Sequence, residues 1–263
     1  MSEAKESTKY FFSRTNGRAS LLAIAPLSLR AHSSFTFFSL PYTINPMTSA
    51  SNKMSDDAQQ AHDYLLQLGK LTVDFAHVER VPLYGSDRPE SDVEHSFHLA
   101  ISAIEIAANY HPELDVGLVA QFSLVHDLPE VHVGDVPTFD ISEEDRAKKE
   151  ADEKAATEQL LRELPPHLAG LLERYEEQTE PEARFVRFID KLLPAVIHAT
   201  VSEPNKKMFK EKYNMHTLEQ IEKGDPARVA YLKKMFPEFD FIHIVRGLVV
   251  QSSRERIYGH KSN

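Results

Sequence analysis

Apolar residues recur at intervals of three and four from Asp56 onward, and strict alternation of apolar and polar residues is almost absent. This periodicity is typical of amphipathic helices, each with one buried face. The first apolar stripe consists of Leu65, Leu68, Leu71 and Phe75. The pattern predicts an all-α fold for the body of the chain.

The clearest helix start lies at Ser91, because Ser91 and Glu94 have the capping-box spacing and precede a long apolar stretch. This start places His95 in the first turn, where a polar side chain can face a cleft. The residues expected to face the core from this helix are Phe97, Ile101, Ile104 and Ala108.

Further helices are expected along the rest of the chain. Residues 142–164 interleave Glu and Lys, which indicates a solvated helix, and Pro165-Pro166 starts another. Residues 239–250 are apolar enough for a buried closing helix or, less favoured, a strand. The other predicted helices cover residues 116–127, 182–201, 217–221 and 229–236.

The first 54 residues differ in composition from the rest. Glu3 and Glu6 are their only acidic residues, and residues 9–53 are basic, acid-free and rich in serine. An organellar transit peptide has this composition, and so does a disordered tail. We therefore expect a disordered or targeting extension over residues 1–54 and one domain over residues 55–263. The expected location is the cytoplasm, or a mitochondrion or other organelle if the extension is a transit peptide.

Composition narrows the classes of partner. The chain has 263 residues, no cysteine and a formal net charge of −10. The acidic balance argues against a nucleic-acid polymer as the main partner, since neutralising phosphates needs clustered Lys and Arg. No apolar run is long enough to span a bilayer, so no membrane partner is expected. The lack of cysteine excludes disulfides, catalytic thiols and thiolate zinc sites.

The candidate chemistry centres on His126-Asp127, which ends an apolar helical run just before Pro129. By itself the pair has an ordinary explanation as surface residues at a helix end. However, His95 and Asp190 lie in two other apolar helical segments, where their ordinary role would be that of buried polar residues bonded to the backbone.

Together these residues supply two imidazoles and two carboxylates, a mixed donor set that suits Mn, Co, Ni, Fe or Zn better than calcium, with Mg also open. A metal with open positions can activate water and polarise a phosphoryl oxygen. The four residues therefore predict a hydrolase with a divalent metal cofactor.

The order His, His-Asp, Asp resembles the pattern that names the HD-domain phosphohydrolase superfamily. The resemblance covers roughly residues 60–195 and is greatest to the 5'-deoxynucleotidase branch, that of HD-domain-containing protein 2. Four sequence blocks carry it: Glu79-Arg80-Val81-Pro82-Leu83-Tyr84, Glu94-His95-Ser96, His126-Asp127-Leu128-Pro129-Glu130 and Gly134-Asp135-Val136-Pro137-Thr138.

The resemblance implies one helical HD domain with the metal site between its helices, acting on deoxyribonucleoside 5'-monophosphates as a homodimer. The residues that it implies as metal ligands are His95, His126, Asp127 and Asp190. It makes Glu130 and Asp127 catalytic, with Glu130 acting on the attacking water. Arg80 would contact the 5'-phosphate, and Asp135 would hold the deoxyribose.

Two positions depart from the family pattern. Val81 stands where some relatives have a tryptophan near the sugar, and Pro129 could change the direction of Glu130. Each substrate-site residue also has an ordinary alternative: Arg80 as a surface partner of Glu79 or Asp87, Glu130 on a solvated edge, and Asp135 as a turn residue. His98 and His132 could belong to the surroundings of the site or to a second metal.

Two alternative functions remain open. One is another HD phosphohydrolase, acting on cyclic nucleotides, nucleoside triphosphates or alarmones. The other belongs to a different class, a non-catalytic metal-bearing module that binds a nucleotide or a protein.

Overall fold

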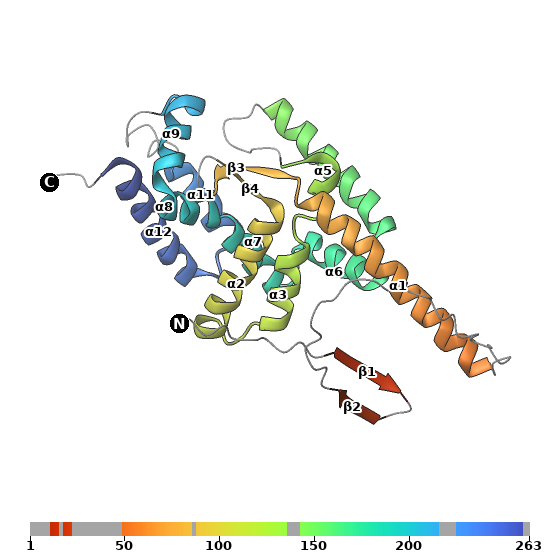
Figure 1. Ribbon diagram of the computed structural model, residues 1–263. Helices are drawn as coiled ribbons and strands as arrows, with labels where there is room; N and C mark the ends of the chain where they lie inside the picture. The colour runs from red at the N-terminus through yellow and green to blue at the C-terminus, as the bar shows by residue number, and fades with distance from the viewer. Residues whose placement is uncertain are drawn as a thin grey trace, which may run out of the picture. The chain divides into compact units, whose positions relative to one another are not determined.

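The protein is described from a computed structural model, which covers residues 11–15, 18–22, 49–85, 88–135, 143–215 and 225–259 (Figure 1). The chain divides into two compact units, Met1–Ser51 and Asn52–Asn263. The first contains an antiparallel hairpin of β1 (Phe11–Thr15) and β2 (Arg18–Leu22). Most of residues 1–54 lie outside the described residues, so their role as an extension stays a prediction.

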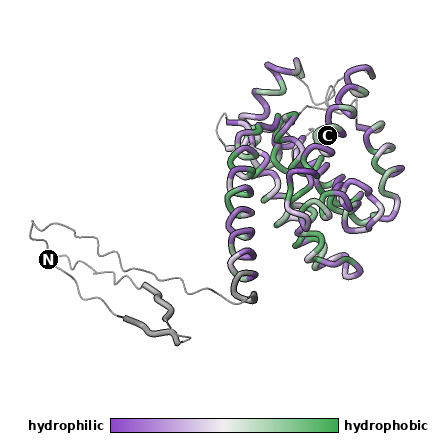
Figure 2. The backbone as a smooth tube through the Cα atoms, turned by 90° about the vertical axis from the view of Figure 1, so that its right-hand side faces the viewer, coloured by the Kyte–Doolittle hydropathy of each residue, from purple (hydrophilic) through white to green (hydrophobic). Residues whose placement is uncertain are grey.

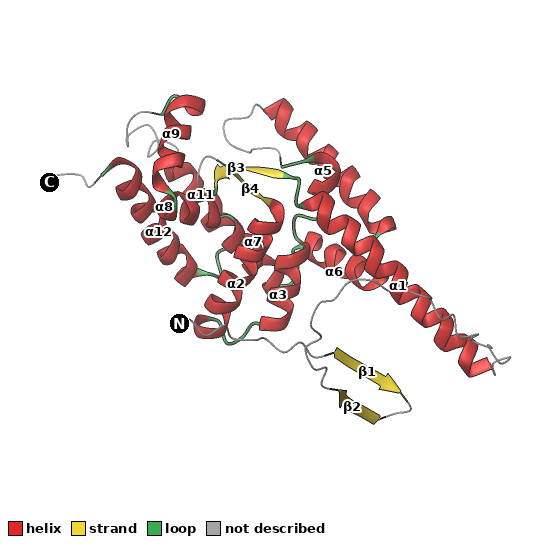
Figure 3. Cartoon of the chain, in the orientation of Figure 1, coloured by secondary structure: helices red, strands yellow, loops and turns green. Residues whose placement is uncertain are grey.

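The second unit is built almost entirely of helices, which confirms the all-α prediction (Figure 3). Its elements are α1 (Ser49–Phe75), β3 (Glu79–Leu83), β4 (Pro89–Ser91), α2 (Asp92–Tyr110), α3 (Val116–Val125), α4 (Glu130–Val133), α5 (Glu143–Glu163), α6 (Pro166–Glu177), α7 (Pro181–Asp190), α8 (Leu193–Thr200), α9 (Ser202–Tyr213), α11 (Asp225–Met235) and α12 (Asp240–Tyr258). Hydrophilic and hydrophobic residues are interspersed along these helices, as expected for helices with one apolar face (Figure 2). None of the helices in the described part of the chain is both long and apolar enough to span a membrane.

The core lies where α2, α3 and α7 pack together, with α6 also against α3. Phe122 of α3 and Phe185 and Phe188 of α7 are fully buried there. Burying a side chain of this size stabilises the fold by about 1.5–3 kcal/mol. This packing holds the ends of α3 and α7 close to the start of α2.

The predicted core face of α2 was wrong. Phe97 and Ile101 are 64% and 50% exposed. The face that packs against the core instead consists of Leu99, Ala100, Ala103 and Ala107. Alanines on this face let α3 approach closely, whereas the apolar pattern alone does not distinguish the two faces.

Two predicted helix boundaries also change. The single helix predicted over residues 182–201 is broken into α7 and α8, because Pro194 has no N–H and its ring clashes with the carbonyl of Asp190. Asp190 thereby becomes the last residue of α7. The helix predicted over residues 116–127 ends at Val125.

Other expectations for the C-terminal half are mixed. Residues 240–250 are helical, as part of α12, with Phe239 as its N-cap, and α11 contains most of the helix predicted over residues 229–236. The pattern did not predict α9. The helix predicted over residues 217–221 lies outside the described residues.

Sequence periodicity also missed the small antiparallel hairpin of β3 and β4. The buried side chain of Asn205 on α9 attaches this hairpin to the helices. Its Oδ1 accepts the Leu83 N–H at 3.0 Å, and its Nδ2 donates to the carbonyls of Leu83 at 3.0 Å and Val201 at 2.7 Å. One amide therefore satisfies both backbone groups of Leu83.

Asn205→Ala is expected to lower the free energy of unfolding by about 2–3 kcal/mol, because it leaves buried backbone groups without hydrogen bonds. Denaturant unfolding followed by circular dichroism measures this change. The matched control is Asn109→Ala, since Asn109 is exposed and its side chain bonds, among the described residues, to Glu105 on its own helix. Equal effects of the two substitutions would contradict the role given to Asn205.

Candidate metal centre and active site

The start of α2 positions His95. Ser91 Oγ accepts the Glu94 N–H at 3.3 Å, and Glu94 Oε2 accepts the Ser91 N–H at 3.0 Å. This reciprocal pair confirms the capping box expected from the sequence. His95 follows in the first turn with only 1% of its surface exposed.

The turn after α3 positions His126 and Asp127. His126 Nδ1 lies 2.9 Å from the Ser123 carbonyl, which can only accept, so Nδ1 carries the proton. In the neutral imidazole the lone pair of Nε2 is then free, which is the form that binds a metal. Asp127 Oδ2 lies 2.8 Å from this Nε2. Both residues reach one point because α3 has already ended.

Asp190 completes the group from the end of α7, with Oδ1 3.1 Å from His95 Nε2. Four ligand atoms, one each from His95, His126, Asp127 and Asp190, lie within 4.8 Å of one another. The structure therefore brings together all four predicted metal ligands.

The donor set and its burial fit a divalent metal. His126 Nε2 is buried and, although it lies 2.8 Å from Asp127 Oδ2, it makes no well-formed hydrogen bond among the described residues, which is costly unless another partner binds it. Two imidazoles and two carboxylates suit a transition metal of borderline softness. Such an ion, when bound, supplies a Lewis acid that polarises a phosphoryl oxygen and activates water.

The charges of these groups depend on their neighbours. Burial opposes a charged His95, but contacts with Asp190 and Glu90 outweigh it and raise the pKa of His95 to about 9. Burial likewise opposes ionisation of Asp127, yet the neighbouring His126 and Arg80 hold the pKa of Asp127 below its usual range.

Arg80 extends from β3 into this cluster. Its Nη1 lies 2.6 Å from Asp127 Oδ2 and 3.1 Å from Asp92 Oδ1. Although burial opposes its charge, the attraction of Asp127 and other nearby carboxylates raises the pKa of Arg80 above its usual value. Arg80 is thus a buried cation of the site, which disfavours the alternative of a surface partner.

Glu130 is the first residue of α4 and faces the same cluster, with Oε2 3.7 Å from Arg80 Nη1. Pro129 before it is the N-cap residue of this short helix, with φ −59° and ψ −22°. Proline suits this position, because it has a fixed φ and needs no N–H partner there. Pro129 therefore does not turn Glu130 away from the site. Burial, followed by the charges of Asp127 and Asp92, raises the pKa of Glu130 to about 11.

Asp135 is a half-buried residue that follows Gly134, whose φ of 72° favours glycine. Burial raises the pKa of Asp135, while the charge of Arg80 lowers it. The structure therefore places Asp135 within electrostatic reach of Arg80. Residues 136–142, including Pro137, lie outside the described part.

Sequence reasoning missed two buried carboxylates, Glu90 and Asp92, on either side of Ser91. Burial raises the pKa of Asp92 to about 6, against contacts with Glu130 and Arg80 that lower it. An acidic residue in the first turn of a helix usually stabilises the helix dipole. The position of Asp92 in the sequence therefore did not indicate a role in the site. A charged residue immediately before the capping box was the available signal for Glu90.

The two remaining candidate histidines differ. His132 Nε2 lies 3.1 Å from Glu163 Oε2 on α5, so it links α4 to that helix. His98 is half-buried on α2, and burial lowers its pKa. Neither belongs to the four-residue cluster of possible metal ligands found within the described ranges.

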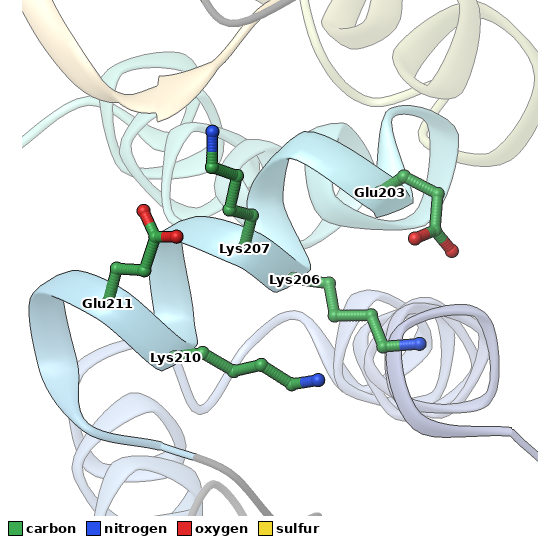
Figure 4. A pocket seen from close by; sticks show the side chains of 5 residues that line it. All are labelled: Glu203, Lys206, Lys207, Lys210 and Glu211. Atoms are coloured by element: carbon green, nitrogen blue, oxygen red, sulfur yellow. The ribbon is translucent and has the colours of Figure 1, made fainter.

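A separate hollow of about 330 Å³ lies on α9 (Figure 4). It is lined by Glu203, Lys206, Lys207, Lys210 and Glu211. All five come from one helix and combine both signs of charge, as on an ordinary solvated helical surface. We assign no site to it.

Comparison with known proteins agrees with this geometry. The family model described as HD domain matches residues 76–228, more than half of the chain and all of the predicted site residues. The chain belongs to the HD domain family. A crystal structure titled a predicted metal-dependent phosphohydrolase, from Magnetospirillum magnetotacticum MS-1, matches with a TM-score of 0.54 and 23% identity, covering 74% of this chain and 96% of that one. This likeness shows a shared fold.

Several relatives of this HD domain protein are named 5'-deoxynucleotidase HDDC2. The Xenopus laevis protein is 34% identical over 137 residues, covering 48% of this chain and 64% of the relative. The Homo sapiens protein is 34% identical over 134 residues, covering 48% and 63%. The Bos taurus protein is 32% identical over 152 residues, covering 55% and 71%. The chain therefore spans just under two thirds of the frog and human relatives.

Proposed function

We propose that this HD domain protein is a metal-dependent 5'-deoxynucleotidase, which releases phosphate from deoxyribonucleoside 5'-monophosphates. One observation carries the proposal: Arg80 and Glu130 lie beside the four possible metal ligands, and both are close to one of these ligands, Asp127. Phosphomonoester hydrolysis requires a group that activates the attacking water, positive charge that stabilises the transition state, and a group that binds the phosphate. The names of the relatives support the choice of a deoxynucleotide.

Each residue then has a defined task. Arg80 presents a planar guanidinium that matches phosphate oxygens. Glu130 Oε2 takes a proton from the attacking water as the new bond to phosphorus forms and the bond to the 5'-oxygen breaks. The departing 5'-oxygen takes up a proton from solvent water, and Glu130 returns its own proton to solvent. The negative charge of Asp127 is one of those that raise the pKa of Glu130. A cation held by Asp127 would offset this charge and so favour the ionised form of Glu130, which this step needs.

Asp135 is proposed to hold the deoxyribose. Its half-buried position, within electrostatic reach of Arg80, supports a place at the sugar end of a bound monophosphate. A carboxylate there can accept a hydrogen bond from a sugar hydroxyl.

The test is phosphate release from a panel of ribonucleotides and deoxyribonucleotides, with Co, Mn, Mg or Zn added back after chelation. We expect deoxyribonucleoside monophosphates to be turned over most efficiently. Turnover of a triphosphate or cyclic nucleotide without any of a deoxymonophosphate would overturn the proposal. Metal binding without any turnover would indicate a non-catalytic module.

Arg80→Ala is expected to raise KM by about 10- to 100-fold, because a charge-assisted hydrogen bond contributes about 1.5–3 kcal/mol. Metal content should be unchanged, since the substitution removes a cation rather than a ligand. Steady-state kinetics and metal analysis measure the two effects. Arg174→Ala is the control, because Arg174 forms an exposed pair with Glu180. Loss of metal with an unchanged KM would contradict the assignment.

The homodimer implied by the resemblance stays a prediction. Ile244 and Leu248 on α12 are 65% and 61% exposed and one helical turn apart. They provide the apolar surface on the C-terminal helix that such an assembly needs.

A further inference from the structure

Glu90 is a buried acidic residue to which the proposed reaction assigns no task. It lies in β4, directly before the Ser91 cap of α2, and is 1% exposed. A glutamate is rarely buried to this extent unless it is paired. Its partners therefore indicate its role.

Glu90 Oε2 lies 3.5 Å from His95 Nδ1 and 3.8 Å from Arg80 Nε. The other ring nitrogen, His95 Nε2, lies 3.1 Å from Asp190 Oδ1 and 3.7 Å from Asp127 Oδ2. The two edges of the imidazole thus face different groups: Nε2 faces the metal-ligand cluster, and Nδ1 faces Glu90.

A neutral imidazole that binds a metal through Nε2 must carry its proton on Nδ1. Metal-bound histidines generally donate a hydrogen bond through this N–H to a carboxylate or carbonyl, which fixes the tautomer and the ring orientation. For His126 the acceptor is the Ser123 carbonyl. Glu90 is in the corresponding position for His95.

We propose that Glu90 is a positioning residue, which accepts a hydrogen bond from the Nδ1–H of His95 and so holds Nε2 toward the metal. Because it concerns metal binding without substrate, this inference goes beyond the proposed reaction and does not depend on it. Arg80 Nε provides positive charge on the other side of the Glu90 carboxylate.

The simpler explanation is that Glu90 only balances the buried charge of Arg80. However, Arg80 already has two closer carboxylates, Asp127 at 2.6 Å and Asp92 at 3.1 Å. Removing a mere counterion would weaken cation binding equally on substitution by glutamine or by alanine, since both remove one negative charge near the site. The difference between these two substitutions, together with the His95 Nδ1 proton, therefore separates the two explanations.

The experiment compares Glu90→Gln and Glu90→Ala with the unaltered full chain, titrated with Co²⁺ in the absence of nucleotide. Glu90→Ala is expected to weaken Co²⁺ binding by about 10- to 100-fold, as is typical when the outer partner of a ligating histidine is lost. Glu90→Gln should weaken it less, because its amide oxygen still accepts a hydrogen bond. Nuclear magnetic resonance of the Zn²⁺-loaded proteins follows the His95 Nδ1 proton, whose resonance should shift in Glu90→Gln.

Glu113→Gln is the matched control, since Glu113 Oε1 lies 2.9 Å from His111 Nδ1, outside the site. It should leave Co²⁺ binding unchanged. Unaltered Co²⁺ affinity in both Glu90 variants would overturn the proposal, even with a lower Tm. If Glu90→Ala does not fold, Glu90→Gln decides: an unchanged affinity and an unshifted His95 Nδ1 proton would overturn it. Failure to hydrolyse nucleotides would count only against the proposed function.

Discussion

Replacing Asp127 with alanine is expected to remove metal binding and phosphate release together, while the helices stay folded. Asp127 Oδ2 lies at the centre of the site, 2.8 Å from His126 Nε2, 2.6 Å from Arg80 Nη1 and 3.7 Å from His95 Nε2. Asp127→Ala takes away one of four ligands directly. Its effect on metal affinity should therefore exceed the roughly 10- to 100-fold loss that follows removal of an outer-shell partner.

The fold should tolerate Asp127→Ala because Asp127 lies in the turn after α3 rather than in the core. Arg80 keeps Asp92 as a partner at 3.1 Å, so its buried charge is not left alone. Metal content after dialysis, phosphate release with excess metal and circular dichroism measure the three effects. Asp63→Ala is the control, since Asp63 is exposed on α1. Full activity with an unchanged metal content would show that the site is wrongly assigned.

Glu130→Gln is expected to lower kcat by about 10²- to 10⁴-fold, the usual contribution of a general acid or base. The amide has nearly the shape of the carboxyl group but cannot take the proton of the attacking water. Metal content and KM should change little, because the four proposed ligands and Arg80 remain. A lower kcat with nearly unchanged KM and metal content distinguishes a role in proton transfer from a structural role.

Single-turnover and steady-state phosphate release, together with metal analysis, measure the effect of Glu130→Gln. The control is Glu163→Gln, which alters a glutamate that contacts His132 outside the metal cluster. An unchanged kcat in Glu130→Gln would remove Glu130 from the reaction. Loss of metal would instead make Glu130 a ligand.

Features that depend on residues close together in the sequence were predicted correctly from local patterns. The capping box at Ser91 and Glu94 is present as expected, because its hydrogen bonds join residues three positions apart. Pro194 was also visible in the sequence, and its clash with the preceding turn explains the end of α7 at Asp190. The error over residues 182–201 arose from weighing apolar periodicity above this local constraint.

Contacts between distant segments could not be predicted in the same way. Phe97 and Leu99 are both apolar, and only packing against α3 decides that Leu99 is buried while Phe97 is exposed. Glu90 and Asp92 read as ordinary charged residues beside a helix start. Their burial follows from the packing of β4 against α2 and of β3 against α8 and α9.

By itself, the sequence determined the helical class and the types of residue available for chemistry, since periodicity, caps and donor atoms are local properties. The resemblance of its blocks to a known family added the roles of His95, His126, Asp127 and Asp190. Only the tertiary structure decided that these four side chains reach one point, that Arg80 is buried among carboxylates, and that Glu90 faces His95. Such contacts join segments up to about a hundred residues apart, so they depend on how the core packs rather than on any local pattern.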